Sequence, residues 1–345
     1  MEKLLNQPKS LIGQSLKNLE SLAESLGSKK FRGRQLFDWI YSKQLDDYGK
    51  MSNLSLDLKE KLKGIPVHPL KLLNKDVTNS RSTQKYLFEV NSGNMIESVL
   101  MVDGKRITVC LSTQVGCAVD CDFCATAKMG FVQNLTSGEI IDQFLQLQKI
   151  SPRRITNVVF MGMGEPFLNY DNTIQAASLL HHPNGINMGA WRITISTSGI
   201  IRKMNQYAKE GHPYKLAVSL NATNQEQRLK TMPITKSNSF LDLINSSKNY
   251  TTLSRKKITF EYVMLLKIND TIEDAKALIN LLSSINCKLN IIPYNEIDGS
   301  YKRPNEKKID DFLFILKKAP FPVTIRWSKG QEIDAGCGQL VTTTN

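Results

Sequence analysis

The sequence lacks the features of membrane and secreted proteins. No stretch of the 345-residue chain approaches the roughly 20 apolar residues that a membrane helix needs. Residues 1–10 contain charges and a proline but no apolar run before a cleavage site, so a secretory signal is not expected. No internal repeat or low-complexity segment is visible. These absences indicate a cytoplasmic protein made of one large domain, or of a large domain with a small appendage.

Acidic residues are scarce relative to basic ones. The chain has 45 Lys and Arg but only 32 Asp and Glu, a formal net charge of +13. This excess favours a polyanionic partner, because cations that neutralise phosphates release condensed counterions. The run from Lys29 to Arg34 is either a solvated loop or a phosphate-contacting surface. Its four candidate RNA-contacting residues are Lys29, Lys30, Arg32 and Arg34.

Cysteines are also few, and three of the six lie within eight residues. In a reducing compartment, clustered cysteines bind metals or perform chemistry more often than they form disulfides. Cys117, Cys121 and Cys124 have the spacing C-x3-C-x2-C. Three thiolates in one short loop can ligate three irons of a cubic cluster and leave the fourth iron open. Such an iron can chelate a methionine derivative, whose carbon–sulfur bond is then cleaved by one electron.

Structural zinc is the alternative for this loop, with Cys110 as a fourth ligand. Zinc sites usually pair two C-x2-C knuckles, and only one such pair is present. The four histidines of the chain all lie outside the loop, at positions 68, 181, 182 and 212. A non-catalytic, zinc-stabilised RNA-binding module remains open as a function of a different class.

Strand-like and helix-like segments alternate after residue 106, which favours a parallel sheet with crossover helices. Such a sheet can form a partial barrel, whose chemistry gathers at the carboxyl ends of the strands. Residues 15–63 have helical periodicity, and two short strands are expected at 85–90 and 97–101. The strands expected in the barrel are Ile107–Ser112, Asn157–Met161, Arg192–Ser196, Lys215–Leu220, Ile258–Met264, Leu289–Pro293 and Val323–Arg326. The helices expected between them include Ser137–Lys149, Ile272–Ser284 and Asn305–Lys318.

The cysteine loop resembles that of the radical S-adenosylmethionine (SAM) superfamily, where it follows the first barrel strand. Met161–Pro166 resembles that superfamily's glycine–glutamate motif, in which glycines admit the ligand and a carboxylate binds its ammonium group. Five motifs in order resemble the RlmN family of dual-specificity adenine-C2 RNA methyltransferases, and the resemblance extends from about residue 11 to 340. These motifs are Arg34–Tyr41, Gln114–Cys117, Gly162–Asn169, Ile292–Asn295 and Cys337–Leu340.

The resemblance implies an α/β fold, a radical SAM partial (β/α)6 TIM-like barrel with a small N-terminal helical accessory domain. We expect residues 1–65 to form this RNA-binding accessory domain and 66–105 a short β linker region. Residues 106–330 then form the barrel core, and the loop 331–345 carries the methyl-accepting cysteine. The implied cofactors are a [4Fe-4S] cluster on Cys117, Cys121 and Cys124, and two SAM molecules per turnover.

Three catalytic residues follow from the resemblance. Cys337 takes a methyl group from one SAM; a radical made from the second SAM activates that methyl group for addition to C2 of the adenine. Glu97 removes the C2 proton, and Cys110 releases the product by forming a transient disulfide with Cys337. Without the resemblance, Cys110 would be a small buried side chain, Glu97 a surface carboxylate and Cys337 part of a turn. Cys287 is interpreted as a core residue at the end of a helix.

The SAM pocket is also assigned by resemblance. One departure from the family is Asn221, which replaces the usual histidine; it can form hydrogen bonds but cannot titrate near neutral pH. The expected SAM-binding residues are Gly164, Glu165, Ser196, Ser219, Leu220, Asn221 and Asn295.

The implied substrates are an adenosine in the peptidyl transferase centre of 23S rRNA and the adenosine 3′ of the anticodon in tRNA. An electron donor such as flavodoxin or ferredoxin is a further partner, no membrane is involved, and a monomer is expected. The closest alternative is the related adenine-C8 rRNA methyltransferase of the resistance type. Gly164–Asn169 and the long helical N-terminus resemble the C2 enzymes more closely.

Overall fold

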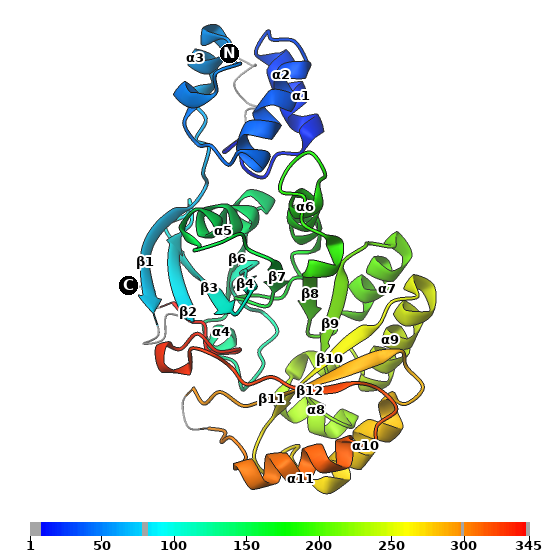
Figure 1. Cartoon of the computed structure of the whole chain (residues 1–345). Coiled ribbons are helices and arrows are strands. Elements are labelled where there is room, and N and C mark those ends of the chain that lie inside the picture. Colours follow the sequence, from blue (N-terminus) through cyan, green and yellow to red (C-terminus); the bar gives the residue numbers. More distant parts are fainter. Residues whose placement is uncertain (1–7, 78–81, 298–299, 343–345) are drawn as a thin grey trace.

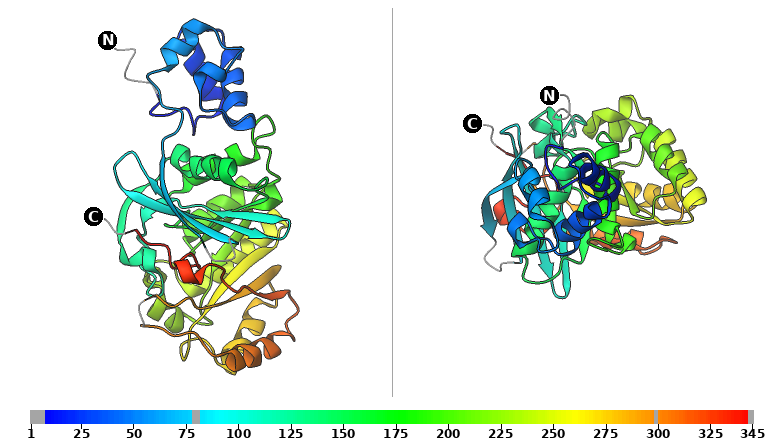
Figure 2. Two further views of the ribbon diagram at one scale, coloured as in Figure 1. Left: turned by 60° about the vertical axis from the view of Figure 1, so that its left-hand side comes forward. Right: turned by 90° about the horizontal axis from the view of Figure 1, so that it is seen from above.

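The computed structural model describes residues 8–77, 82–297 and 300–342, and the side chains of all of these except 75–77. A small group of helices projects from one end of a larger α/β body (Figures 1 and 2). Residues 1–7 of the expected accessory domain and 343–345 of the expected C-terminal loop lie outside the described residues. No helix in the described ranges is long and apolar enough to cross a membrane.

The N-terminal helices form where helical periodicity and serine caps coincide. The hydroxyl of Ser15 accepts a hydrogen bond from the Asn18 amide, and Ser55 caps a later helix in the same way. Gly33 allows two helices to touch, since a Cβ there would lie 2.3 Å from the backbone of Glu20. The elements of this region are α1 (Leu16–Ser25), α2 (Phe31–Phe37), the π-helical turn η2 (Asp38–Ser42), η3 (Tyr48–Lys50) and α3 (Leu56–Leu62).

The basic run of this region is partly neutralised within the protein. Glu20 pairs with Lys30 at 3.6 Å and with Arg34 at 2.8 Å. The Tyr41 hydroxyl accepts a hydrogen bond from the Gly13 amide and so fixes the start of this region, and Tyr41 also packs against Gly185 of the body. A Cβ on Gly13 would lie 2.4 Å from Gly138 of the first barrel helix, so this contact requires two glycines. The helical region is therefore docked closely on the barrel.

One ten-stranded sheet runs through the described body in the order β1-β2-β3-β4-β7-β8-β9-β10-β11-β12. Strands β1 to β4 pair antiparallel, and all pairs from β4 to β12 are parallel. The sheet is open, with β1 and β12 at its edges. Its strands are β1 (Lys71–Val77), β2 (Thr83–Glu89), β3 (Met95–Asp103), β4 (Arg106–Cys110), β7 (Asn157–Phe160), β8 (Ile193–Thr197), β9 (Lys215–Ser219), β10 (Ile258–Met264), β11 (Cys287–Pro293) and β12 (Val323–Ile325).

Helices connect the parallel strands, as the alternation predicted. Capping boxes begin two of them, at Thr136 with Glu139 and at Thr271 with Asp274. The main helices are α5 (Ser137–Ile150), α6 (Tyr170–His181), α7 (Ile201–Glu210), α8 (Gln225–Thr231), α9 (Phe240–Ser254), α10 (Ile272–Leu282) and α11 (Glu306–Leu316). The short turns are η4 (Ala190–Arg192), η5 (Pro233–Lys236) and η6 (Gln331–Ile333).

The expected partial barrel is confirmed, with β4 and β7–β11 as its six strands and β12 as a short addition at the edge. Strand β1 was not predicted, because its sequence is polar. A polar strand is tolerated there because β1 lies at the edge of the sheet. Cys287 is buried, as expected, but it begins strand β11 and does not end a helix.

A hairpin missing from the predicted elements supports the cysteine loop. Strands β5 (Gln114–Gly116) and β6 (Phe131–Asn134) pair antiparallel on either side of the loop, which also contains the short helix α4 (Ala125–Lys128). Gly116 has φ +69°, and a Cβ there would lie 1.8 Å from the carbonyl oxygen of Gly130. The glycine before Cys117 is therefore required for the hairpin to close at the loop.

Candidate active site

The predicted site residues converge on one cavity at the carboxyl ends of the barrel strands. Its empty space is about 1030 Å³, including the open mouth. The three clustered cysteines, most of the predicted SAM-binding residues and Cys337 line it together. The predicted residues on its wall are Cys117, Cys121, Cys124, Gly164, Glu165, Ser196, Ser219, Asn221, Asn295 and Cys337.

The cysteine loop presents its thiols from a fixed backbone. The Asp122 amide donates to the Thr231 carbonyl, which ties the loop to the end of α8. Burial raises the pKa of Cys117 to about 12 and that of Cys121 well above its usual value. Within the described residues, no three His, Cys, Asp or Glu side chains are arranged around a single-ion position.

Glu165 is buried at the back of the cavity and held in one orientation. One carboxylate oxygen accepts from the Phe167 amide at 2.9 Å and the other from the Ser198 amide at 2.6 Å. Burial raises the pKa of Glu165, and these two bonds oppose that effect. Each oxygen keeps a second lone pair, so the carboxylate can still accept a hydrogen bond from a ligand. This arrangement suits a group that binds an ammonium.

The ends of β8 and β9 carry four predicted SAM-binding residues, not all of which line the cavity. Ser196 and Ser219 face the cavity, whereas Leu220 is fully buried and does not line it. Asn221 has φ +56° and joins two strands, because its side-chain oxygen accepts from the Val263 amide at 2.8 Å. Its side-chain nitrogen faces the Met232 sulfur at 3.4 Å. Both polar atoms of Asn221 thus have partners in the protein.

Arg228 on α8 lies beneath this wall and carries no motif signal in the sequence. It is fully buried, and its guanidinium donates to the carbonyls of Ser198, Ser219 and Leu220 and to the Thr235 hydroxyl. Burial lowers its pKa to about 10, an effect opposed by the charges of Cys121 and Glu165. Arg228 is therefore a buried cation that braces the strand ends behind the cysteine loop.

The C-terminal loop brings Cys337 to the cysteine loop. The Ala125 amide, next to Cys124, donates to the Gly338 carbonyl at 2.7 Å, and the Thr126 hydroxyl donates to the Leu340 carbonyl at 2.6 Å. Gly338 has φ +84°, a conformation that favours glycine. The glycines beside Cys337 therefore shape a turn that contacts the loop of the clustered cysteines.

Asn295 holds the same turn from the other side. Its side-chain nitrogen donates to the Cys337 carbonyl at 2.9 Å and to the Ser328 hydroxyl at 2.8 Å. Its oxygen accepts from the Gln331 side chain at 2.7 Å. In this structure Asn295 therefore positions Cys337, besides lining the cavity as predicted.

Cys110 and Cys337 lie near each other as free thiols. All six cysteines are unbonded, so the predicted transient disulfide is not supported by this structure. Cys337 opens onto the cavity, but desolvation by the surrounding protein raises its pKa to about 11. The charge of Arg326 opposes this increase, whereas the charges of Glu261 and Cys124 add to it. Burial raises the pKa of Cys110 to about 12, and the charge of Cys337 adds to this effect. Cys337 thus shares the cavity of the clustered cysteines and interacts electrostatically with Cys110 and Cys124.

Glu97 is buried on β3 and does not line the cavity. One carboxylate oxygen lies 3.0 Å from the Lys85 ammonium, and the other accepts from the Val341 amide at 2.9 Å. This position excludes the interpretation of Glu97 as an ordinary surface carboxylate. It places Glu97 against the C-terminal segment, four residues beyond Cys337.

Two charged residues on the cavity wall were missed by the sequence analysis. Glu261 on β10 is 6% exposed, and Arg326 directly follows β12. Both belong to strands that were predicted, and alternation along those strands could have placed their side chains inside the barrel.

An open parallel barrel with three cysteines in the loop after its first strand defines a radical SAM enzyme. The model of the radical SAM superfamily matches residues 111–282. A second model, the ribosomal RNA large subunit methyltransferase N-terminal domain, matches residues 9–67.

Individual relatives define the family more specifically than these two models do. The chain is 42% identical over 333 residues to a probable dual-specificity RNA methyltransferase RlmN of Thermotoga neapolitana, covering 96% of this chain and 97% of the relative. A protein of the same description from Alkaliphilus oremlandii is 40% identical, with 96% of each chain covered. A crystal structure of a radical SAM methyltransferase from Sphaerobacter thermophilus superposes with a TM-score of 0.93 at 39% identity, covering 96% of this chain and 99% of that one. The chain belongs to the RlmN family of dual-specificity RNA methyltransferases.

Proposed function

We propose that the chain methylates C2 of an adenosine in 23S rRNA and C2 of the adenosine 3′ of the anticodon in tRNA. The methyl group travels on Cys337 as S-methylcysteine, and two SAM molecules are used per turnover. The observation that carries this proposal is the position of Cys337. It opens onto the cavity of the clustered cysteines and interacts electrostatically with both Cys124 and Cys110.

The residues present fit the implied cofactors. Cys117, Cys121 and Cys124 supply three thiolates from one loop, and the other two cysteines of the region, Cys110 and Cys337, lie outside it. Glu165 offers an oriented carboxylate for an ammonium group. When bound, the cluster and SAM supply one-electron chemistry that can remove a hydrogen atom from a methyl group.

Cys337 must lose its proton before it can accept a methyl group. Burial opposes this step, whereas the positive charge of Arg326 favours the thiolate. Cys110 lies close enough to Cys337 to interact with it, as the resolving thiol must. Glu97 acts as the proton acceptor only after the C-terminal segment moves, because Val341 and Lys85 now occupy its two oxygens.

The decisive experiment identifies the product. Anaerobically prepared protein, SAM, a reductant and RNA are combined, and the RNA is digested for nucleoside mass spectrometry. We expect 2-methyladenosine together with 5′-deoxyadenosine. A product of 8-methyladenosine would instead assign the chain to the resistance-type alternative.

Metal analysis separates the enzyme from the non-catalytic alternative. We expect about four irons and four sulfides per chain in the anaerobic protein. Stoichiometric zinc without sulfide would support the RNA-binding module. The Cys110→Ala variant should accumulate protein covalently joined to RNA, and normal turnover by this variant would refute the resolving role of Cys110.

A further inference from the structure

Glu261 presents an unsatisfied oxygen to the active-site cavity. One carboxylate oxygen accepts from the Asn290 side chain at 2.9 Å. The other is buried and has no hydrogen-bond partner among the described residues. A buried acceptor without a donor is costly. Since Glu261 lines the cavity, a ligand that donates a hydrogen bond there would remove this cost.

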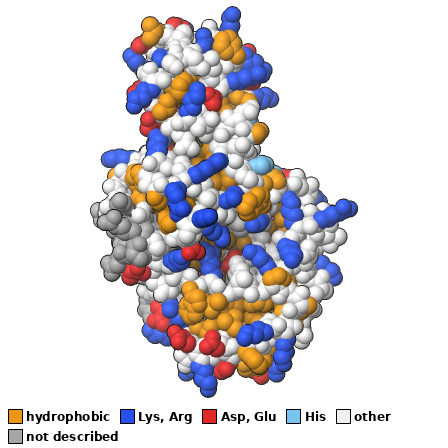
Figure 3. Space-filling model, viewed as in Figure 1, with side chains coloured by type: hydrophobic (Ala, Val, Ile, Leu, Met, Phe, Trp, Pro, Cys, Tyr) orange, Lys and Arg blue, Asp and Glu red, His pale blue; other side chains and the backbone are white. Residues whose placement is uncertain are grey.

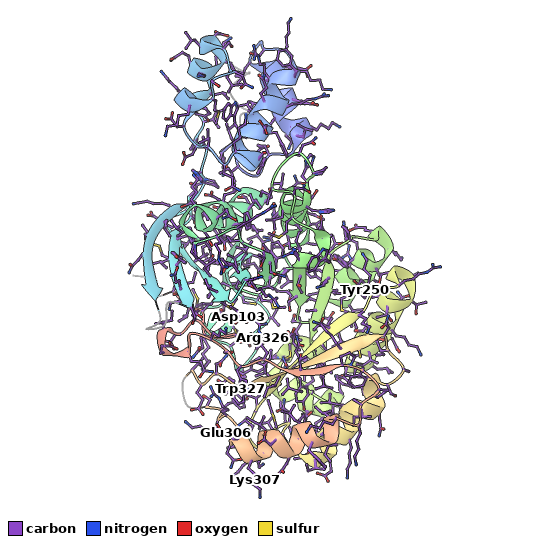
Figure 4. All side chains as sticks on the ribbon, in the orientation of Figure 1. Asp103, Tyr250, Glu306, Lys307, Arg326 and Trp327 are labelled. Carbon is purple, nitrogen blue, oxygen red and sulfur yellow. The ribbon has the colours of Figure 1, made fainter. Side chains whose placement is uncertain are left out.

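Arg326 presents the complementary group to the same cavity. Within the described part of the chain its guanidinium donates to the Met161 sulfur at 3.6 Å, a weak acceptor. No carboxylate of the described residues lies within 4.0 Å of it, so Arg326 and Glu261 are not paired with each other. Figure 4 shows Arg326 near the middle of the molecule, between Asp103 and Trp327. Most of its five N–H donors remain available to a ligand.

Glu261, Arg326 and Cys337 share the wall of one cavity and act on one another electrostatically. The charge of Arg326 acts on both Glu261 and Cys337, and Glu261 acts on Cys337 as well. The site therefore offers an acceptor, a donor and the thiol that carries the methyl group.

The Watson–Crick edge of adenine presents groups that complement this acceptor and this donor. Its exocyclic amine is a donor, N1 is an acceptor, and C2 follows N1 directly. We propose that Glu261 accepts a hydrogen bond from the exocyclic amine of the target adenine and that Arg326 donates to N1, which places C2 at Cys337. This inference rests on the proposed function and adds to it the residues that select the base.

Guanine does not fit this arrangement. Its six-position is a carbonyl, which would face the Glu261 carboxylate, and its N1 carries a proton that would face the Arg326 guanidinium. A site built to pair a polar edge rejects the wrong edge strongly, because its buried groups would be left unsatisfied. The pair therefore accounts for adenine selection without any contact outside the cavity.

The test combines protein variants with base analogues in the cluster-loaded enzyme. Target RNA is made with adenosine, with purine riboside, which lacks the amine, or with 1-deazaadenosine, which lacks N1. Glu261→Gln should lower kcat/KM on adenosine RNA about tenfold and have little further effect on purine-riboside RNA. Arg326→Met should show the same pattern with 1-deazaadenosine. Equal losses on all three RNAs would overturn the proposal.

A second measurement tests whether Glu261 recognises the adenine of SAM and not the adenine of the RNA. Methylation of Cys337 by SAM, followed by peptide mass spectrometry, requires no RNA. Glu261→Gln should retain wild-type SAM affinity and wild-type Cys337 methylation, whereas a loss of SAM affinity would refute recognition of the RNA base. Glu226→Gln on α8 and Arg202→Met on α7 remove exposed charges and serve as controls. If the wild-type protein forms no methylated Cys337 and no methylated RNA, the proposed function itself fails.

Discussion

The two cysteine-bearing loops of the active site are held by different kinds of interaction. The loop of Cys117, Cys121 and Cys124 is framed by the β5–β6 hairpin and tied to the end of α8 by the hydrogen bond from the Asp122 amide to the Thr231 carbonyl. The loop of Cys337 has little regular structure around it and is held by hydrogen bonds from Asn295, Ala125 and Thr126. We call the loop of Cys117, Cys121 and Cys124 the cofactor loop and the loop of Cys337 the carrier loop. The comparison indicates that the cofactor loop is rigid, whereas the carrier loop can be released by breaking a few hydrogen bonds.

The carrier loop also joins groups that need to separate during a reaction. Val341 occupies one oxygen of Glu97, and Asn295 holds the carbonyl of Cys337 while lining the cavity. Movement of this loop would expose Glu97 and displace Cys337 at the same time. Figure 3 shows Lys and Arg side chains distributed over this face of both the helical region and the larger body.

The largest expected effect separates the chemical roles of the two loops. Cys121→Ala should abolish RNA methylation and most of the bound iron, because the cluster loses one of three ligands. Cys337→Ala should abolish methylation equally but retain normal iron and sulfide. Activity assays with metal and sulfide analysis check both variants. If Cys337→Ala also lost its cluster, the two loops would not be independent.

The next effect concerns Arg228, which braces the strand ends behind the cofactor loop. Arg228→Met preserves much of the side-chain volume but leaves four acceptors without their donor. We expect the free energy of unfolding to fall by about 3 kcal/mol. Urea denaturation followed by circular dichroism measures this, with the exposed Arg202→Met as control. A loss below about 1 kcal/mol would mean that Arg228 does not brace the strand ends behind the cysteine loop.

A pH dependence distinguishes the carrier thiol from an ordinary one. The pKa of Cys337 is raised to about 11, so its reactive thiolate forms only as the pH increases. In the metal-free reduced protein, alkylation by iodoacetamide should rise about tenfold per pH unit from 7 to 9.5 without a plateau. Cys110, with a pKa of about 12 and a buried side chain, should react more slowly. Peptide mass spectrometry follows both residues, and a plateau near pH 8.5 would contradict the raised pKa.

The smallest expected effect concerns Asn295, which holds the carrier loop by hydrogen bonds. Asn295→Ala removes the bonds to Cys337, Ser328 and Gln331. Alkylation of Cys337 at fixed pH should become about fivefold faster, because the loop opens more often. Gln331→Ala removes one of these bonds and should have a smaller effect. An unchanged rate in Asn295→Ala would show that Asn295 does not restrain Cys337.

The sequence was informative where local spacing determines structure. The C-x3-C-x2-C spacing identified three residues that do line one cavity, and the alternation of strands and helices predicted the barrel. It was less informative where a role depends on neighbours distant in the chain. Leu220 follows a predicted strand but its side chain lies in the core, and Glu97 lies beside Val341 and not on the cavity wall.

The sequence by itself determined the elements, their order and the family, because hydrophobic periodicity and short motifs are local properties of the chain. Only the tertiary structure brought Cys337 within electrostatic range of Cys110 and Cys124. Only it turned Arg326 toward the cavity and left one oxygen of Glu261 without a hydrogen-bond partner among the described residues. The physical reason is that burial, electrostatic interaction and unsatisfied hydrogen bonds depend on distances between residues far apart in the sequence.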